Sequence, residues 1–238
     1  MNSLKKYIAE FIGTFILVTI GCGTAMLVGC DANNGCGYVL TALAFGLAIV
    51  AMAYSVGNIS GGHVNPAVSC AVFCIGELSF TDLIGYIIAQ CLGAFAGSGL
   101  LALIFSLGDI EDKTGGYGTN GFAGVGGSSA CALIVEIVLT FIFIMNILGV
   151  TSKNQTHGSF GGLIIGLTLV GVHILGIGLT GTSVNPARSL GPAIVAAING
   201  NSTPMSEYWP FLLGPIIGGC LAAFIYKFLE TPSEEAEG

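Results

Sequence analysis

Two Asn-Pro-Ala tripeptides are the residues whose types and spacing point most directly to a chemical role in this sequence. They read Asn65-Pro66-Ala67 and Asn185-Pro186-Ala187. Asn is a preferred helix N-cap, and Pro is tolerated at the first helical position because its missing N–H would have no partner there. Each tripeptide therefore predicts the start of a short helix, over residues 66 to about 76 and 186 to about 199.

Three charged side chains accompany these tripeptides in otherwise apolar surroundings. Glu10 and Glu136 occupy corresponding places in two apolar runs, and Arg188 directly follows the second tripeptide. We expect each Glu to accept hydrogen bonds from backbone N–H groups of the segment that ends in Asn-Pro-Ala. Acid–base catalysis is the alternative, but no nucleophile, metal-ligand cluster or second close carboxylate accompanies either residue. The sequence therefore indicates neither an enzyme nor a cofactor site.

The composition indicates a chain whose solvent is a lipid bilayer. Of its 238 residues, 53% are hydrophobic and only 8% are charged, whereas a typical soluble domain has about 25% charged residues. The net charge of −7 argues against binding of nucleic acid. Residues 230–238 are rich in Glu, which predicts a solvated acidic tail.

Six apolar runs are long enough to cross a bilayer, which takes about 20 residues of helix. They cover about residues 7–28, 37–58, 82–107, 128–150, 159–180 and 207–229. The Asn-Pro-Ala segments follow the second and fifth runs and are too short to cross alone. Irregular backbone at membrane depth is tolerated only where protein or a water-filled cavity surrounds it. We therefore expect an all-α membrane protein with six transmembrane helices and two re-entrant half-helices.

Positively charged residues predict the orientation of the chain across the membrane. Lys5 and Lys6 precede the first run, Lys153 follows the fourth, and Lys227 lies near the end of the sixth. Because the chain is expected to cross the membrane six times, all of these lysines lie on the same side of it. This predicts that both termini are cytoplasmic. The first run lacks a signal-peptide cleavage site, so we expect it to be retained.

The paired motifs indicate one domain built from two inverted halves. The halves cover about residues 7–107 and 128–229, and the Gly-rich loop 108–127 joins them. Each half has three crossings, an odd number, so the two halves have opposite orientations. Features shared by inverted halves meet near the bilayer midplane.

Two half-helices that start at the midplane would create a positive electrostatic maximum there. A helix N-terminus carries about half a positive charge, and the amides of Asn65 and Asn185 would add hydrogen-bond donors. A water molecule at this point would turn its oxygen toward both helices. That orientation interrupts the continuous donor–acceptor chain that proton hopping requires.

In these features the sequence resembles the aquaporin (major intrinsic protein) family. The resemblance rests on the two Asn-Pro-Ala boxes, a Glu-x-x-x-Thr-Phe pattern in the first and fourth runs, and Arg188, and it covers about residues 7–229. Half-helix dipoles and an Arg are already known to exclude protons and cations in aquaporin-type pores. The resemblance implies a homotetramer with one pore in each subunit and no cofactor.

The resemblance also implies a narrow selectivity filter around Arg188. Its other members correspond to Phe45, His173 and Thr182. An Arg at membrane depth costs about 2.5–3.5 kcal/mol on insertion scales, which favours a polar cavity around it. Taken alone, His173 could equally be a satisfied core histidine. A bulky Phe, a polar His, and Ser189 after the Arg resemble the water-selective branch, whereas glycerol channels typically carry Trp, Gly and Asp at these three places.

Two histidines and two cysteines near the predicted loops admit two interpretations each. His63, two residues before Asn65, is expected to line the cytoplasmic vestibule, with packing of its loop as the alternative. His157 is expected to be a solvated loop residue, with a pH gate as the alternative. Cys30 and Cys36 flank a loop and could form a disulfide only on an oxidising side of the membrane.

The sequence as a whole predicts a passive, water-selective channel. Its compact loops and short termini are typical of prokaryotic members of the family, so we expect a bacterial or archaeal plasma membrane. A glycerol or small-solute facilitator of the same family is the first alternative. A secondary transporter also uses inverted repeats, but it would need a coupling acid that faces the substrate path. An adhesion or junction protein would leave the paired polar boxes unexplained.

Overall fold

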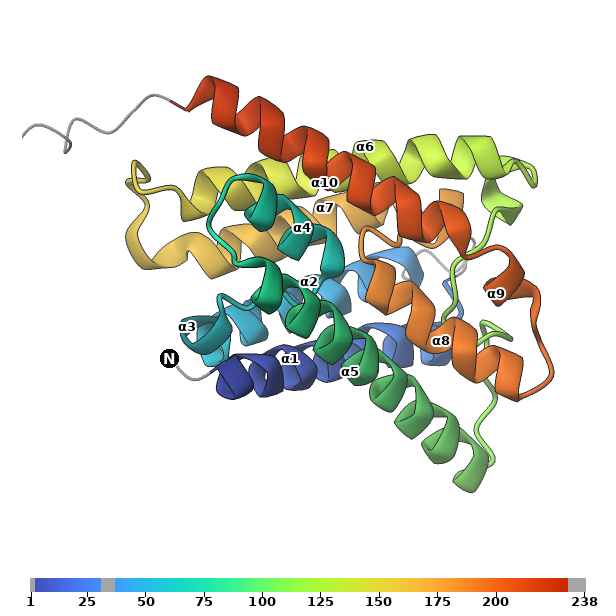
Figure 1. Ribbon diagram of the computed structural model, residues 1–238. Coiled ribbons are helices and arrows are strands. Elements are labelled where there is room, and N and C mark those ends of the chain that lie inside the picture. The colour runs from blue at the N-terminus through green and yellow to red at the C-terminus, as the bar shows by residue number, and fades with distance from the viewer. Residues whose placement is uncertain (1–2, 31–36, 231–238) are drawn as a thin grey trace, which may run out of the picture.

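The computed structural model describes residues 3–30 and 37–230, which form a helical bundle (Figure 1). Within these ranges, six helices are long and apolar enough to cross a membrane. They are α1 (Ser3–Val28), α2 (Gly37–Ser55), α5 (Phe80–Leu107), α6 (Ser129–Thr151), α7 (Gly161–Thr180) and α10 (Trp209–Leu229). The predicted all-α fold with six spans is confirmed.

The two half-helices begin where the Asn-Pro-Ala boxes predict. They are α4 (Pro66–Cys74) and α8 (Pro186–Ile198). Each box Asn is the N-cap: the side chain of Asn65 accepts a hydrogen bond from Ala67 N, and that of Asn185 accepts from Ala187 N. From the middle of the bundle, α4 and α8 extend toward opposite ends (Figure 1). This arrangement is that of two re-entrant elements in inverted halves.

Short elements connect the longer helices. They are α3 (Gly57–Ser60), η2 (Ala123–Val125), η3 (Gly158–Phe160) and α9 (Thr203–Ser206). The second apolar run was expected to continue to residue 58, but α2 ends at Ser55. Val56 lies between the two helices as the N-cap of the separate helix α3, which begins at Gly57.

Two sequence predictions fall wholly or partly outside the described residues. Cys36 lies there, as does the acidic tail beyond Glu230. Cys30 is described as a free thiol that lies 3.3 Å from the hydroxyl oxygen of Thr41. Burial raises the pKa of the Cys30 thiol, which favours the protonated, less reactive form.

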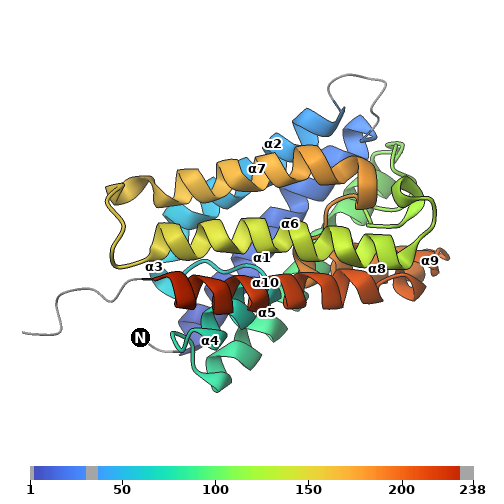
Figure 2. The same cartoon turned by 90° about the horizontal axis from the view of Figure 1, so that it is seen from above.

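The long helices pack in pairs that repeat in the two halves. Helix α1 packs along α5 in the first half, α6 packs along α10 in the second, and α2 packs along α7 between the halves. Figure 2 shows the α6–α10 and α2–α7 pairs side by side. Helix α1 begins and α10 ends on the same side of the bundle (Figure 1), which we call the terminal side.

Equivalent glycines bring the paired helices into backbone contact. A Cβ at Gly93 of α5 would overlap the carbonyl oxygen of Phe11 in α1, and a Cβ at Gly218 of α10 would overlap that of Ile137 in α6. Phe11 and Ile137 directly follow Glu10 and Glu136. Small residues allow this close approach of helices within a membrane, so the glycines determine how deeply each Glu is set into the bundle.

Gly93→Ala should therefore destabilise the protein by about 1–3 kcal/mol, the usual cost of overpacking a well-packed site. Gly99→Ala is the matched control because a Cβ at this position of the same helix meets no atom within 4 Å. Its expected effect is neutral or stabilising, since Ala is the better helix former. Thermal unfolding midpoints of the purified proteins in detergent would test this, and equal midpoints would contradict the close contact.

Candidate functional site

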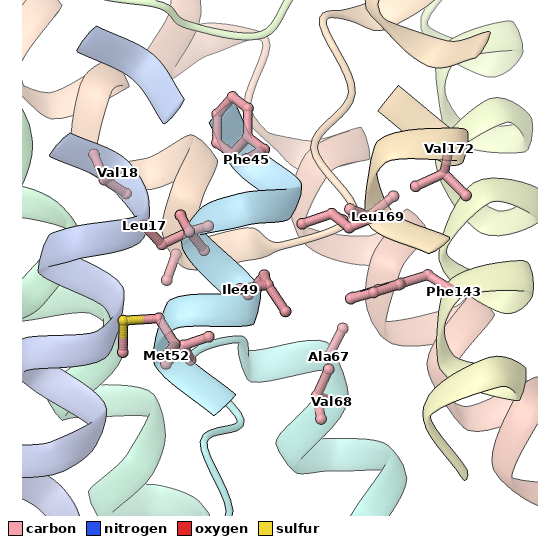
Figure 3. Packing of buried hydrophobic residues seen from close by; sticks show 14 of the residues in the cluster. Leu17, Val18, Phe45, Ile49, Met52, Ala67, Val68, Phe143, Leu169 and Val172 are labelled. Atoms are coloured by element: carbon pink, nitrogen blue, oxygen red, sulfur yellow. The ribbon is translucent and has the colours of Figure 1, made fainter. Parts of the chain in front are cut away.

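A central cavity of about 350 Å³ lies within the bundle beside both Asn-Pro-Ala boxes. Much of its wall is apolar, formed by Leu17, Ile49, Val68, Phe143, Ile147 and Leu169. Figure 3 shows several of these side chains facing one another from α1, α2, α4, α6 and α7. Lys6 and Glu77 line the cavity on the terminal side, and Phe45, His173 and Arg188 line it farther in. The site is thus a largely apolar cavity with a few polar groups at defined places.

The two boxes are tied to each other at the centre of the bundle. The amide nitrogen of Asn65 donates to the carbonyl oxygen of Val184 at 2.7 Å, and that of Asn185 donates to Val64 at 2.9 Å. Each amide has two hydrogens, so one hydrogen on each Asn remains available. Both Asn side chains line the cavity, where these remaining hydrogens can be donated to a solute.

The loop that leads into each Asn-Pro-Ala box, which we call the box loop, contains a valine in an unfavourable backbone conformation. Val64 has φ 44° and Val184 has φ 45°, in the left-handed region that is a genuine outlier for a β-branched residue. Such strain persists only where the surrounding structure enforces it. The carboxylates of Glu10 and Glu136 do so here, because Val64 N donates to Glu10 at 2.6 Å and Val184 N donates to Glu136 at 2.8 Å.

Glu10 collects further donors from the first box loop and from α5. It accepts from the hydroxyl of Ser60 at 2.6 Å, from His63 N at 2.9 Å and from the amide of Gln90 at 2.7 Å. With Val64 N, four donors therefore surround this fully buried carboxylate. Gln90 was not identified from the sequence, although a Gln within an apolar run was a signal that could have revealed it.

Glu136 has the same role in the second half but with fewer partners. It accepts from the hydroxyl of Thr180 at 2.7 Å and from Ser183 N at 2.9 Å, besides Val184 N. Glu136 is fully buried. Neither Glu10 nor this residue lines the central cavity, so each acts on the loop rather than on a solute.

Three of the four residues expected in the filter meet at the cavity wall. The rings of Phe45 and His173 stack with centroids 4.5 Å apart, and the guanidinium carbon of Arg188 lies 4.8 Å from the Phe45 centroid. Thr182 does not line the cavity. Its side chain packs against Gly176 of α7, because a Cβ at that glycine would overlap the Thr182 hydroxyl.

Arg188 is oriented by the loop that joins the halves. Its guanidinium donates to the carbonyl oxygen of Gly118 and to the side-chain oxygen of Asn120, both at 2.9 Å. The side-chain amide nitrogen of Asn120 donates to the carbonyl oxygen of Thr180 at 3.1 Å. The hydroxyl of Ser189 donates to the side-chain oxygen of Asn120 at 2.7 Å. Sequence reasoning missed Asn120, whose only signal was a polar side chain within a Gly-rich loop.

The two remaining histidines have defined partners. His63 lines the cavity, and its ring also contacts Ser69 and the ring of Tyr86. His157 was expected to be solvated, but it is half-buried and its imidazole lies 2.9 Å from the carbonyl oxygen of Val150. The prediction of a solvated His157 was wrong because the loop folds back onto the end of α6.

The chain is similar to known proteins both in sequence and in structure. A sequence model of the major intrinsic protein family matches residues 1–226. Aquaporin Z of Brucella melitensis is 44% identical over 229 residues, which are 95% of this chain and 98% of the relative. Glycerol uptake facilitator protein-like 6 of Lactiplantibacillus plantarum is 42% identical over 226 residues, with the same two coverages. The aquaglyceroporin of Plasmodium falciparum has the same fold, with a TM-score of 0.86, 24% identity, and coverage of 96% of this chain and 97% of that one.

Proposed function

Because this chain belongs to the major intrinsic protein family and is a membrane water channel, we propose that water crosses it in single file through the central cavity. The path passes Phe45, His173 and Arg188 and then the pair Asn65 and Asn185. The single observation that carries this route is that all five side chains line one cavity. Transport is passive, driven by an osmotic gradient.

Exclusion of protons follows from how water is oriented at the centre of the route. The half-helices α4 and α8 both start there, and each N-terminus carries about half a positive charge. Asn65 and Asn185, each with one amide hydrogen still available, line the same cavity. A water oxygen therefore turns toward the Asn pair, and its hydrogens point away, so neighbouring waters do not form one continuous proton wire.

The filter explains the preference for water over larger solutes. The Phe45–His173 stack and the adjacent Arg188 narrow the route, and the guanidinium adds a fixed positive charge that repels cations. A glycerol facilitator is the alternative because one relative carries that name. Two aromatic rings at the constriction favour water, the smaller solute.

The multi-pass chain has cytoplasmic termini in a prokaryotic plasma membrane, supported by the lysines near the terminal side. The inverted halves comprise about residues 7–107 and 128–229, and the subunits form a homotetramer. A catalytic or coupled-transport role is disfavoured because Glu10 and Glu136 are buried away from the cavity.

Stopped-flow light scattering of proteoliposomes tests this function. Under a sucrose gradient, liposomes with the protein should shrink much faster than empty liposomes, with a low activation energy. Under a glycerol gradient they should shrink without fast re-swelling. Fast re-swelling would assign the chain to the glycerol facilitators, and shrinkage no faster than that of empty liposomes would contradict a constitutively open channel.

A further inference from the structure

We propose that both histidines on the cavity wall are held as the Nδ1–H tautomer, so that each presents a bare Nε2 as a hydrogen-bond acceptor to passing water. The residues are His63 and His173, and Ser69 and Gln90 are the positioning residues for His63. This proposal rests on the proposed function and deepens it, because it concerns how water is oriented on either side of the Asn pair.

The tautomer of His173 follows from one contact. Its Nδ1 lies 3.0 Å from the carbonyl oxygen of Leu169, and a carbonyl oxygen can only accept a hydrogen bond. The proton of the neutral ring is therefore on Nδ1. Its Nε2 is buried and has no partner among the described residues, and the ring lines the cavity. This nitrogen is thus free to accept a hydrogen from water.

The tautomer of His63 follows from three contacts that converge on the hydroxyl of Ser69. Its oxygen lies 3.1 Å from His63 Nδ1, 3.0 Å from the amide nitrogen of Gln90, and 3.2 Å from the carbonyl oxygen of Asn65. The hydroxyl has one proton and two lone pairs. All three contacts are hydrogen bonds only if the proton goes to Asn65 O and His63 Nδ1 donates. With the other tautomer, two oxygen lone pairs would face each other.

Gln90 fixes the direction of this network. Its amide nitrogen lies 2.7 Å from Glu10 and 3.0 Å from Ser69, so the two amide hydrogens are both used. The amide can therefore only donate to Ser69, which occupies one lone pair of the hydroxyl and leaves the other for His63. No partner contacts His63 Nε2 among the described residues, and Gly61 leaves space beside it, since a Cβ there would lie 3.2 Å from this nitrogen.

The two acceptors lie on opposite sides of the Asn pair. His63 is in the loop that enters from the terminal side and precedes Asn65, whereas His173 lies beside Arg188 in the filter. Water at the Asn pair points its hydrogens outward in both directions. An acceptor farther out on each side receives such hydrogens and extends the same orientation away from the centre. The histidines thus reinforce the interruption of the proton wire.

Solid-state ¹⁵N NMR of the histidine-labelled channel in liposomes tests the assignment directly. At pH 8 a histidine with an ordinary pKa of about 6.5 is neutral, and the chain has 3 His. The His157→Gln variant removes the third set of signals, and His63→Gln then assigns the remaining two. We expect a protonated Nδ1 and a bare Nε2 for both rings. A protonated Nε2 in either ring would overturn the proposal.

Variants of Ser69 test its positioning role. Ser69→Ala should let His63 adopt the Nε2–H tautomer and should lower water permeability, and Ser69→Thr should restore both because it keeps the hydroxyl. An unchanged His63 spectrum in Ser69→Ala would overturn the role of Ser69, and if that variant does not fold, the spectra of the unaltered channel still decide the assignment. A channel with these tautomers but no osmotic water flux would contradict the proposed function and leave the tautomers intact.

Discussion

Glu136→Ala should abolish most water conduction and reduce the yield of folded protein. The substitution leaves three buried donors without an acceptor, namely the backbone N–H groups of Ser183 and Val184 and the hydroxyl of Thr180. Each such orphaned group costs about 1–3 kcal/mol. The substitution also releases Val184 from its left-handed backbone conformation (φ 45°). Since every 1.4 kcal/mol is about a tenfold change in population, the box loop should leave its native position in most molecules.

The measurement is osmotic water permeability per folded channel, with folded protein quantified by size-exclusion chromatography. Glu136→Gln keeps the size and one acceptor oxygen, so we expect a smaller loss than with Ala. Glu111→Ala is the matched control because this acid is exposed in the joining loop, and it should behave as the unaltered chain does. Wild-type conduction by Glu136→Ala would show that the loop does not need this carboxylate.

The parts of the fold that the sequence predicts well are those fixed by local physical chemistry. The six spans follow from hydropathy and length, and the half-helix starts follow from the N-cap preference of Asn with Pro after it. The placement of Glu10 and Glu136 could be inferred from their repetition before each box. The first two signals are local, and the third comes from comparing the two halves of the sequence.

The parts that could not be predicted depend on contacts between distant segments. Asn120 orients Arg188 from 68 residues away, and Gln90 reaches Glu10 across 80 residues. Neither residue has a local pattern that reveals its partner. The two hydrogen bonds between the box loops likewise depend on how closely the two half-helices approach each other. Thr182 shows the converse, because it lies next to the second box in sequence, but its side chain packs behind the cavity wall.

His173→Gly should convert the channel into one that also conducts glycerol. The substitution removes the ring that stacks on Phe45 at a centroid distance of 4.5 Å, and it leaves an opening in the cavity wall at the proposed filter. Phe45 cannot easily move to fill this opening, since its ring edge is packed against Gly21 of α1, where even a Cβ would overlap it. We expect glycerol permeability to rise at least about tenfold, a change of 1.4 kcal/mol in the barrier.

Water permeability should change much less than glycerol permeability, because on the proposed route water already passes the unaltered filter. The measurement is the re-swelling rate of proteoliposomes in glycerol, normalised to their shrinkage rate in sucrose. Leu175→Gly is the matched control: it lies two residues farther along α7, and its side chain is 61% exposed on the outer surface. It carries the same cost of about 1 kcal/mol for a Gly within a helix, so it separates loss of helix stability from widening of the filter.

Two outcomes would distinguish the filter from a merely structural histidine. If His173→Gly and Leu175→Gly both lower water flux and leave glycerol excluded, the ring at position 173 supports α7 and does not limit solute size. If only His173→Gly admits glycerol, the Phe45–His173 stack is the size-limiting element. Cations should remain excluded in that variant, because Arg188 keeps its bonds to Gly118 and Asn120 and its positive charge stays at the constriction. Size selection and charge selection would then reside in different residues of the same filter.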